Sequence, residues 1–310
     1  MCTETIRRMN FWERDLTPAC GRQASPLLEG EGNKKMQIID GKKISKEILD
    51  EIKKEVTMLS FTPVFCDVLV GEDPASIQYV DMKAKRAESV GISFHKAAFP
   101  ASISTNDLIK EIQALNKIEN MCGIIVQLPL PLHTDKQKVF DSIDSSFDVD
   151  CLGTLASEKF YNGDTKIGFP TALSCMALLD SVGLDLKTKK IVVLGRGMLV
   201  GKPVSALLQF RNLSPVVIQS KTENKEELIK NADVIISGMG QGKYITGDKI
   251  KTGAVIIDAG TSESNGGIVG DVDLESVKLV AGYVSPVPGG VGPVTVAMLL
   301  KNVLTVAKSK

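Results

Sequence analysis

The sequence has 310 residues, the length of about two ordinary domains. Hydrophobic residues make up 43% and charged residues 24%, as in a globular chain whose core is large enough to fold without disulfides. The 37 basic residues equal the 37 acidic ones, so charge gives no reason to expect nucleic acid or an anionic membrane as a partner. No apolar run reaches the roughly 18 residues of a membrane span, so no transmembrane helix is expected.

The six cysteines are scattered without a CxxC pair, which favours reduced thiols in a cytoplasmic protein over a zinc site or a disulfide framework. Only two histidines are present, His95 and His133, which argues against histidine-based metal sites and against a Ser-His-Asp triad. We therefore expect no metal cofactor and a cytoplasmic location.

Residues 1–35 differ from the rest of the sequence. They show no steady hydrophobic period, lack the apolar stretch of a signal peptide, and contain acidic residues that transit peptides avoid. We interpret residues 1–35 as a flexible extension, and Met36 as the start of the first ordered domain.

From Met36 onward, strand patterns and helix patterns alternate. Residues 38–56 predict a short strand, a glycine turn and an amphipathic helix. The apolar run 63–71 predicts a buried strand, and Asp73, Pro74 and Gly91 predict the start and stop of a helix from Pro74 to Val90. The further elements expected in this half are a strand at 94–100, a helix at 105–117 with a Thr/Asn cap, a strand at 123–132 and a helix near 135–144.

A second alternating set begins near residue 156. Its expected helices are at 171–184, 225–232 and 291–309, with a strand, glycine turn and helix over 189–210. Its other expected strands are at 215–221, 233–240, 253–260 and 278–285. Strands separated by helices form parallel βαβ units, so the sequence predicts an α/β protein of two domains.

The segment from Gly195 to Gly201 is the strongest local signal for a cofactor. It follows the apolar strand IVVL and opens a helix, and its glycines are spaced G-x-G-x-x-x-G at Gly195, Gly197 and Gly201. Such glycines let the backbone turn sharply and approach a pyrophosphate at the helix N-terminus. The spacing is one residue longer than the usual fingerprint, and a plain strand-to-helix turn is the alternative. Strand, glycines and helix together favour a dinucleotide.

The tip of the next strand bears on the choice of cofactor. An NAD site usually has an acidic residue about 20 positions on, which accepts from the ribose 2′-hydroxyl. Here the tip is Gln219-Ser220-Lys221, without an acid. Arg196, Ser220 and Lys221 can instead contact a 2′-phosphate, which favours NADP. The alternative is that Lys221 is a solvated loop lysine.

In the helix from Pro74 to Val90, the polar residues Ser76, Tyr79 and Lys83 share one face. Apolar residues at the same spacing, from Ile77 to Ala87, occupy a neighbouring face that we expect to pack on the sheet. A lysine beside a tyrosine at the edge of an apolar stripe can be desolvated and can move a proton near neutrality. From spacing alone, an exposed amphipathic face explains these residues equally well.

Two other segments add polar candidates. Gln127 ends the apolar run GIIVQ, and ligands bind at the carboxyl ends of parallel strands. Asp148 and Asp150 lie in a loop where their carboxylates can bind amino groups of a ligand. The alternatives for these two residues are a helix cap and a solvated loop.

Five motifs in order resemble the bifunctional methylenetetrahydrofolate dehydrogenase/methenyltetrahydrofolate cyclohydrolase family. They are VGEDPASIQYVDMKAKRAESVGI, GIIVQLPLPLH, FDVDCLG, VVLGRGMLVGKPVSALL and SPVPGGVGPVTVAMLL, and the resemblance extends from about Met36 to the C-terminus. It implies NADP-dependent oxidation of 5,10-methylenetetrahydrofolate to the methenyl form, and hydrolysis of that form to 10-formyltetrahydrofolate.

The resemblance also implies an architecture. It consists of a folate domain over 36–155, completed by the last helix at 291–310, and an NADP-binding Rossmann domain over 156–290. The folate cleft lies between these domains. The implied partners are tetrahydrofolate derivatives and a second copy of the chain in a homodimer, with no nucleic acid and no membrane.

Site roles carry over residue by residue. The resemblance implies that Lys83 is the catalytic lysine, that Gln127 hydrogen-bonds to it, and that Tyr79 stacks on the folate. Ser76 matches a nearby polar contact, Asp150 the residue that binds the pterin edge, and Pro288, Gly289 and Gly290 the loop beside folate and nicotinamide. Cofactor contacts are implied for Gly195, Arg196, Gly197, Gly201, Ser220 and Thr171.

The sequence departs from the family pattern at several positions. The usual glycine after Asp-Val-Asp is Cys151, the usual Asn and Gly a few residues later are Ala156 and Glu158, and Gly-Arg-Ser has become Gly195-Arg196-Gly197. The usual Pro-Cys-Thr-Pro-x-Gly is replaced over Phe169–Ser174. These changes leave three alternatives open: a cyclohydrolase with weakened hydride transfer, an NAD(P) oxidoreductase for another small substrate, and a binding protein without catalysis.

Overall fold

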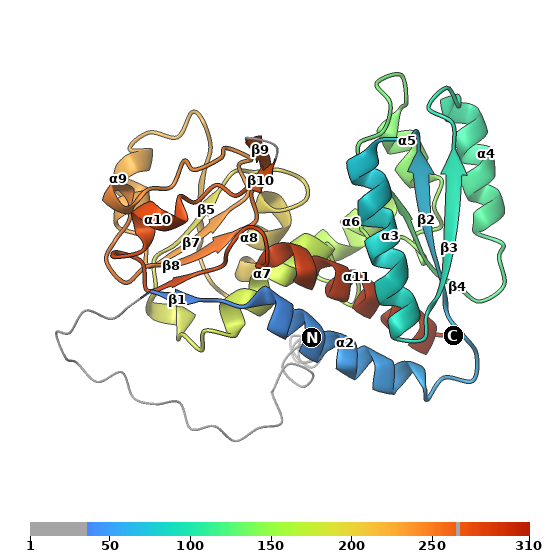
Figure 1. Cartoon of the computed structure of the whole chain (residues 1–310), viewed down its shortest axis with the longest axis horizontal. Helices are drawn as coiled ribbons and strands as arrows, with labels where there is room; N and C mark the ends of the chain where they lie inside the picture. The colour runs from blue at the N-terminus through green and yellow to red at the C-terminus, as the bar shows by residue number, and fades with distance from the viewer. Residues whose placement is uncertain (1–35, 265–266) are drawn as a thin grey trace, which may run out of the picture. The chain divides into compact units, whose positions relative to one another are not determined.

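The computed structural model describes residues 36–264 and 267–310. The predicted flexible extension at 1–35 lies outside the described residues. Within these residues, strands and helices alternate and build two parallel sheets and one short antiparallel hairpin (Figure 1). The predicted α/β class is therefore confirmed.

The first sheet has three parallel strands in the order β3-β2-β4. Its central strand, β2 (Val64–Val70), is buried along nearly its whole length. Strands β3 (Ser93–Phe99) and β4 (Met121–Val126) flank it. The helices of this half are α3 (Pro74–Ser89), α4 (Thr105–Leu115), α5 (Lys136–Asp141) and α6 (Thr154–Tyr161).

The second sheet has six strands in the order β1-β11-β8-β7-β5-β6, and every pair in it is parallel. Its strands are β1 (Gln37–Ile38), β5 (Ile191–Leu194), β6 (Val216–Ile218), β7 (Val234–Ser237), β8 (Val255–Asp258) and β11 (Tyr283–Val284). Its helices are α7 (Pro170–Asp180), α8 (Gly201–Phe210), α9 (Lys225–Lys230) and α10 (Leu274–Val277), with 3₁₀ turns at Leu186–Thr188 and Gly247–Lys249. The hairpin pairs β9 (Ser262–Ser264) with β10 (Gly267–Val269).

The first strand belongs to the second sheet, which the sequence did not indicate. Gln37 and Ile38 of β1 pair in parallel with Tyr283 and Val284 of β11, almost 250 residues later. The chain then enters α2 (Gly41–Val56) and continues to the first sheet. A two-residue strand has no periodicity of its own, so its partner could not be read from the sequence.

Helix α11 (Val291–Lys308) packs along α2 and also contacts α7, α3 and β4 (Figure 1). Its Leu300, Val303 and Leu304 join Leu49 of α2 and Phe65 of β2 in one buried cluster. Among the described residues, α11 is the one helix long and apolar enough to cross a membrane, but 67% of it is buried inside the fold. That burial is the behaviour of a core helix.

Several predicted boundaries were wrong. The strand expected at 278–285 is only Tyr283–Val284, because α10 and a turn precede it, and the strand expected at 215–221 ends at Ile218. The cap of α4 is Ser104, whose hydroxyl accepts from the Asp107 amide, and not Thr105 or Asn106. These errors lie at element ends, where single caps and turns decide the boundary.

Candidate active site

Helix α3 places the predicted polar face at the carboxyl end of β2. Gly71 ends the strand with φ +90°, and the Asp73 carboxylate caps the helix by accepting from the Ser76 amide at 2.8 Å. Ser76 is buried, Tyr79 is half-buried, and Lys83 is only 2% exposed. The ammonium nitrogen of Lys83 lies 4.9 Å from the centre of the Tyr79 ring. The face that spacing alone could not distinguish from a solvated one is therefore largely turned inward.

Lys83 has two close polar partners. Its Nζ donates to Gln127 Oε1 at 2.8 Å, so the predicted contact between these two residues is present. Gln127 follows β4 directly and is half-buried, less enclosed than its place after an apolar run suggested. The second partner is the Asp67 carboxylate, whose Oδ2 lies 2.5 Å from Lys83 Nζ.

Asp67 was not predicted as a site residue from the sequence. It lies in the middle of β2 with none of its surface exposed, inside the apolar run VFCDVLV. One signal could have identified it: a lone acidic residue in a fully buried strand must find a cation, because an unpaired buried carboxylate is very costly. Burial raises the pKa of the Asp67 carboxyl, and the neighbouring Lys83 ammonium lowers it.

The two aspartates of the loop after α5 have different roles. Asp148 is 1% exposed and accepts from the amides of Gly153, at 2.7 Å, and Asp150. Gly153 is the N-cap residue of α6, which has no side-chain cap, so Asp148 holds the loop just before the helix and is not itself its cap. The carboxylate of Asp150 makes no hydrogen bond or ion pair within the described residues.

Asp150 belongs electrostatically to the lysine site. Burial, helped by the charges of Asp148 and Asp67, raises the pKa of its carboxyl to about 7, against the opposing effect of Lys83. Burial and the charges of Asp150 and Asp67 also raise the pKa of Tyr79 to about 12. The tyrosine is therefore neutral at physiological pH.

Cys151, one of the departures from the family pattern, adopts φ +59° and is buried. This left-handed conformation costs a non-glycine residue on the order of 1–2 kcal/mol. The glycine usual at this position would avoid that cost, so the substitution stores strain directly beside Asp150.

The loop of Pro288, Gly289 and Gly290 precedes α11. A Cβ on Gly41 would lie 1.9 Å from the carbonyl oxygen of Gly290, so this loop packs directly on the first turn of α2. Gly289 has φ +106°, a conformation that favours glycine. These contacts fix the loop against α2. They do not place it against Lys83.

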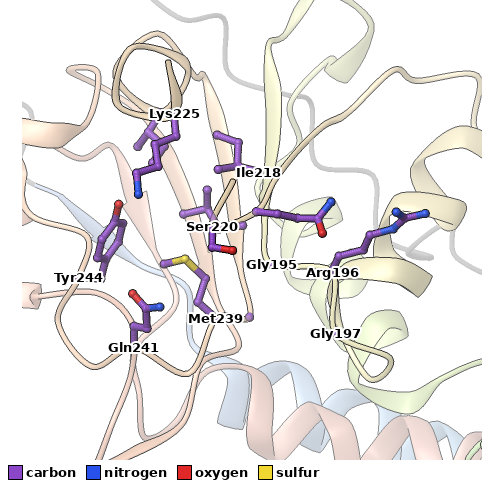
Figure 2. Close-up of a pocket in the computed structure, with 13 residues that line it drawn as sticks. Gly195, Arg196, Gly197, Ile218, Ser220, Lys225, Met239, Gln241 and Tyr244 are labelled. Carbon is purple, nitrogen blue, oxygen red and sulfur yellow. The ribbon is translucent and has the colours of Figure 1, made fainter. Parts of the chain in front are cut away.

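A cavity of about 440 Å³ lies at the carboxyl ends of β5, β6 and β7 (Figure 2). This size falls within the usual range for cofactor sites. The glycines shape its wall: Gly195 has φ +92°, and a Cβ on Gly201 would lie 2.1 Å from the carbonyl oxygen of Gly195. The first turn of α8 therefore packs closely on the loop, as a pyrophosphate-binding turn requires.

The structure brings four of the predicted cofactor residues into the lining: Gly195, Arg196, Gly197 and Ser220. Gly201 packs against the turn but is not among the residues that line the cavity. Thr171, in the first turn of α7, and Lys221 do not line it either. The lining residues that the sequence did not single out include Gln219, Lys225, Ile229, Met239, Gln241 and Tyr244.

Lys225 is the most informative of these additions. Figure 2 shows its side chain and that of Tyr244 on one side of Ser220, with Arg196 extending on the other side. None of the lining residues is acidic. The pocket thus offers two cations and two hydroxyls, with no carboxylate to accept from a ribose 2′-hydroxyl.

The fold and these two sites define an α/β enzyme that combines a dinucleotide pocket with a buried lysine site. Comparison with known proteins makes this specific. The family model for the tetrahydrofolate dehydrogenase/cyclohydrolase catalytic domain matches residues 39–150, and that for its NAD(P)-binding domain matches residues 170–310. The chain belongs to the tetrahydrofolate dehydrogenase/cyclohydrolase family.

Relatives match over nearly their whole length. The bifunctional protein FolD of Moorella thermoacetica is 44% identical over 277 residues, covering 88% of this chain and 99% of its own. The crystal structure of bifunctional FolD from Campylobacter jejuni is 36% identical with a TM-score of 0.85, covering 88% of this chain and 99% of its own. FolD of Trypanosoma brucei, solved with NADP and an inhibitor, is 34% identical with a TM-score of 0.83, covering 89% and 98%. These matches confirm the family resemblance seen in the sequence.

Proposed function

We propose that this chain oxidises 5,10-methylenetetrahydrofolate with NADP and hydrolyses the resulting methenyl form to 10-formyltetrahydrofolate. The observation that carries this proposal is the buried Lys83, held 2.8 Å from Gln127 in a chain of this family. A buried lysine with an ordered amide partner is suited to moving a proton, and hydration of the methenyl bridge requires one to be moved.

In the hydrolytic half, water attacks the methenyl carbon and must lose a proton. Lys83 is the residue we assign to that proton, and Gln127 positions it by accepting from its Nζ. Tyr79, 4.9 Å from Lys83 Nζ, offers a flat ring for stacking on the folate. Its neutral phenol, kept so by burial, adds no charge to the site.

Substrate orientation is assigned to three elements. We propose that Asp150 accepts from the amino groups of the pterin edge, that Ser76 adds a polar contact, and that the loop of Pro288, Gly289 and Gly290 borders folate and nicotinamide. Support for the first role is electrostatic, since Asp150 interacts with both Lys83 and Tyr79.

The residues of the dinucleotide pocket fit NADP. Arg196 and Ser220 are assigned to the 2′-phosphate, and Gly195, Gly197 and Gly201 to the backbone turn beside the pyrophosphate. When bound, NADP supplies the hydride acceptor. Thr171 stays a prediction as a cofactor contact, because it is not among the residues that line the pocket. The acid-free lining is the support for NADP over NAD.

A cyclohydrolase with weakened hydride transfer is the second candidate. Space is open where a side chain on Gly197 would extend, so the serine usual in this family would fit there and its hydroxyl is missing. This departure lies in the dinucleotide pocket, whereas Lys83, Gln127 and Asp150 match the family pattern.

One assay distinguishes the two candidates. Methylenetetrahydrofolate is supplied with NADP and then with NAD, and methenyl formation and decay are followed by absorbance. Reduction of NADP with methenyl loss supports the full proposal. Absence of reduction, with added methenyltetrahydrofolate still hydrolysed, supports the second candidate.

We further propose a homodimer that works in the cytoplasm. Strand β6 is an edge strand of the six-stranded sheet, and Val216 on it is 43% exposed, so this edge is available for pairing with a second copy. Light scattering coupled to size-exclusion chromatography tests this assignment, and a monomeric mass at micromolar concentration would contradict it.

A further inference from the structure

Asp67 is buried more completely than any other charged group around Lys83. Its exposed fraction is 0%, and its ion pair with Lys83 is 2.5 Å long. Among the described residues, neither oxygen of this carboxylate has a hydrogen-bond partner beyond that ion pair. The charge of Asp67 is therefore compensated almost entirely by the same ammonium that contacts Gln127.

A second lysine is near but does little for Asp67. Lys96 on β3 is its register partner, yet the Lys96 side chain is 38% exposed and pairs with Asp81 at 3.2 Å. An exposed cation is screened by water and contributes weakly to a buried carboxylate. Lys83 is thus the effective counter-ion.

We propose that Asp67 is a positioning residue for methenyl hydration, which holds Lys83 as an ammonium against Gln127 and accepts, through Lys83, the proton that water loses. This inference rests on the proposed function of the site. It assigns the proton a destination that Lys83 and Gln127 alone do not provide.

The proton transfer balances as follows. The water oxygen bonds to the methenyl carbon and one of its O–H bonds breaks. That proton passes to Lys83 Nζ while another proton of Lys83 passes to Asp67 Oδ2. The substrate loses its positive charge, and the pair changes from ammonium and carboxylate to ammonium and carboxylic acid. Total charge is unchanged.

The pair also solves an electrostatic problem. The methenyl substrate is a cation, and an unpaired ammonium in a site of low dielectric would repel it. With Asp67 ionised, the pair is neutral when the cation binds. Lys83 Nζ and Asp67 Oδ2 are 2.5 Å apart and both side chains are buried, so each charge compensates the other effectively.

The pH dependence involves every ionisable group that acts on this pair. Besides Asp67 and Lys83 themselves, these groups are Cys66 on β2, Tyr79 on α3, Lys96 on β3 and Asp150 in the loop before α6. The register partner of Asp67 on β4 is the uncharged Ile125. Since Asp67 accepts the proton, hydration should slow as acidification protonates its carboxyl, while Lys83 stays an ammonium.

The test compares the acid limb of hydration with the titration of Lys83 itself. Hydrolysis of methenyltetrahydrofolate is measured against pH at saturating substrate, so that the titration of Asp150, which acts on KM, does not shape the acid limb. The uncatalysed rate in buffer is subtracted. Protein carrying ¹³C at the lysine ε-carbons reports the protonation of Lys83 by nuclear magnetic resonance, and its signal is assigned by its absence in K83R. Both are repeated in D67N and in the control D81N, which removes an exposed carboxylate from the same helix as Lys83.

In the wild type, we expect the hydration rate to fall with acidification while the Lys83 signal stays that of an ammonium. In D67N the amide cannot accept a proton, so Lys83 must lose its own, and the acid limb should move onto the Lys83 titration. D81N should retain the wild-type limb.

The inference is overturned if the wild-type limb coincides with the Lys83 titration, or if D67N keeps the wild-type limb. The wild-type comparison requires no change at Asp67, so it decides the matter even where D67N does not fold. A wild-type chain that hydrolyses no methenyltetrahydrofolate would instead refute the proposed function, and the two failures are thereby separated.

Discussion

The assignment of Arg196 to the 2′-phosphate of NADP makes a quantitative prediction. A hydrogen bond to a charged group is worth about 1.5–3 kcal/mol. Arg196 lines the pocket but is exposed to solvent, so screening places its contribution near the lower end, about 1.5 kcal/mol. Since about 1.4 kcal/mol is a factor of ten, R196A should lower kcat/KM for NADP about tenfold.

The control for this experiment is K221A. Lys221 is the other cation that the sequence placed at this strand tip, but it does not line the pocket, whereas Lys225 does. We expect K221A to retain kcat/KM for NADP within about twofold, and K225A to reduce it, as loss of a charged pocket contact does.

A comparison of NADP with NAD tests the assignment of Arg196 to the 2′-phosphate directly. With NAD, which lacks the 2′-phosphate, R196A should change kcat/KM by less than about twofold, because surface substitutions away from a contact have small effects. Dehydrogenase assays with both cofactors at several salt concentrations provide the measurement. An equal loss with NAD, or a K221A effect as large as that of R196A, would refute the assignment to the 2′-phosphate.

Four further outcomes are expected. K83M should reduce methenyl hydrolysis by at least about 100-fold, as loss of a proton-transfer group does, with unchanged NADP binding by fluorescence titration; an unaltered rate would remove Lys83 from the chemistry. G201A should abolish NADP binding, because its Cβ would lie 2.1 Å from the Gly195 carbonyl oxygen; near-normal affinity in the same titration would contradict this packing. Asn302 of α11 donates through Nδ2 to the buried carbonyls of Val149, at 2.8 Å, and Gly168, at 2.7 Å, and N302A leaves both without this donor. Urea unfolding should therefore show a loss of about 2–4 kcal/mol in the free energy of unfolding, and a loss below about 1 kcal/mol would count against these two hydrogen bonds. Because the Asp150 carboxyl has a pKa of about 7 and must be ionised to accept from the pterin, KM for the folate should rise as pH falls through about 7; D150N should abolish this dependence, and a wild-type KM independent of pH would refute the role.

Much of the fold could be predicted because its strands are long enough to carry a pattern. The run of β4 is apolar throughout, and that of β2 is apolar except for Asp67. Each is followed by turn and cap residues, which fixed strand and helix in order. Strand β1 carries no such pattern. Its two residues pair with β11, and the helices that follow these two strands, α2 and α11, also pack together, so the partner of β1 belongs to tertiary structure and not to a local pattern.

Proximity between candidate site residues could be predicted where helical spacing determined it. Tyr79 and Lys83 are one turn apart, so their contact follows from helix geometry. The contact of Lys83 with Gln127 joins two different elements, and it was implied by the family resemblance and not by spacing. For the dinucleotide pocket, spacing identified the Gly195 turn but not Lys225, which reaches the cavity from the start of the next helix.

Asp67 shows why the rest of the site could not be derived from spacing. Its apolar neighbours identify β2 correctly, and the acid within that run looks like an interruption of the pattern. The buried carboxylate of Asp67 is tolerated because α3 packs against β2 where Lys83 Nζ can approach Asp67 Oδ2 to 2.5 Å. Removing either partner alone would leave a buried charge unpaired, at a cost of about 3–5 kcal/mol. The two residues therefore constrain each other, although 16 positions separate them in the sequence. Because the same lysine also donates to Gln127, a substitution of Asp67 at the centre of the sheet should alter how Lys83 is held against Gln127.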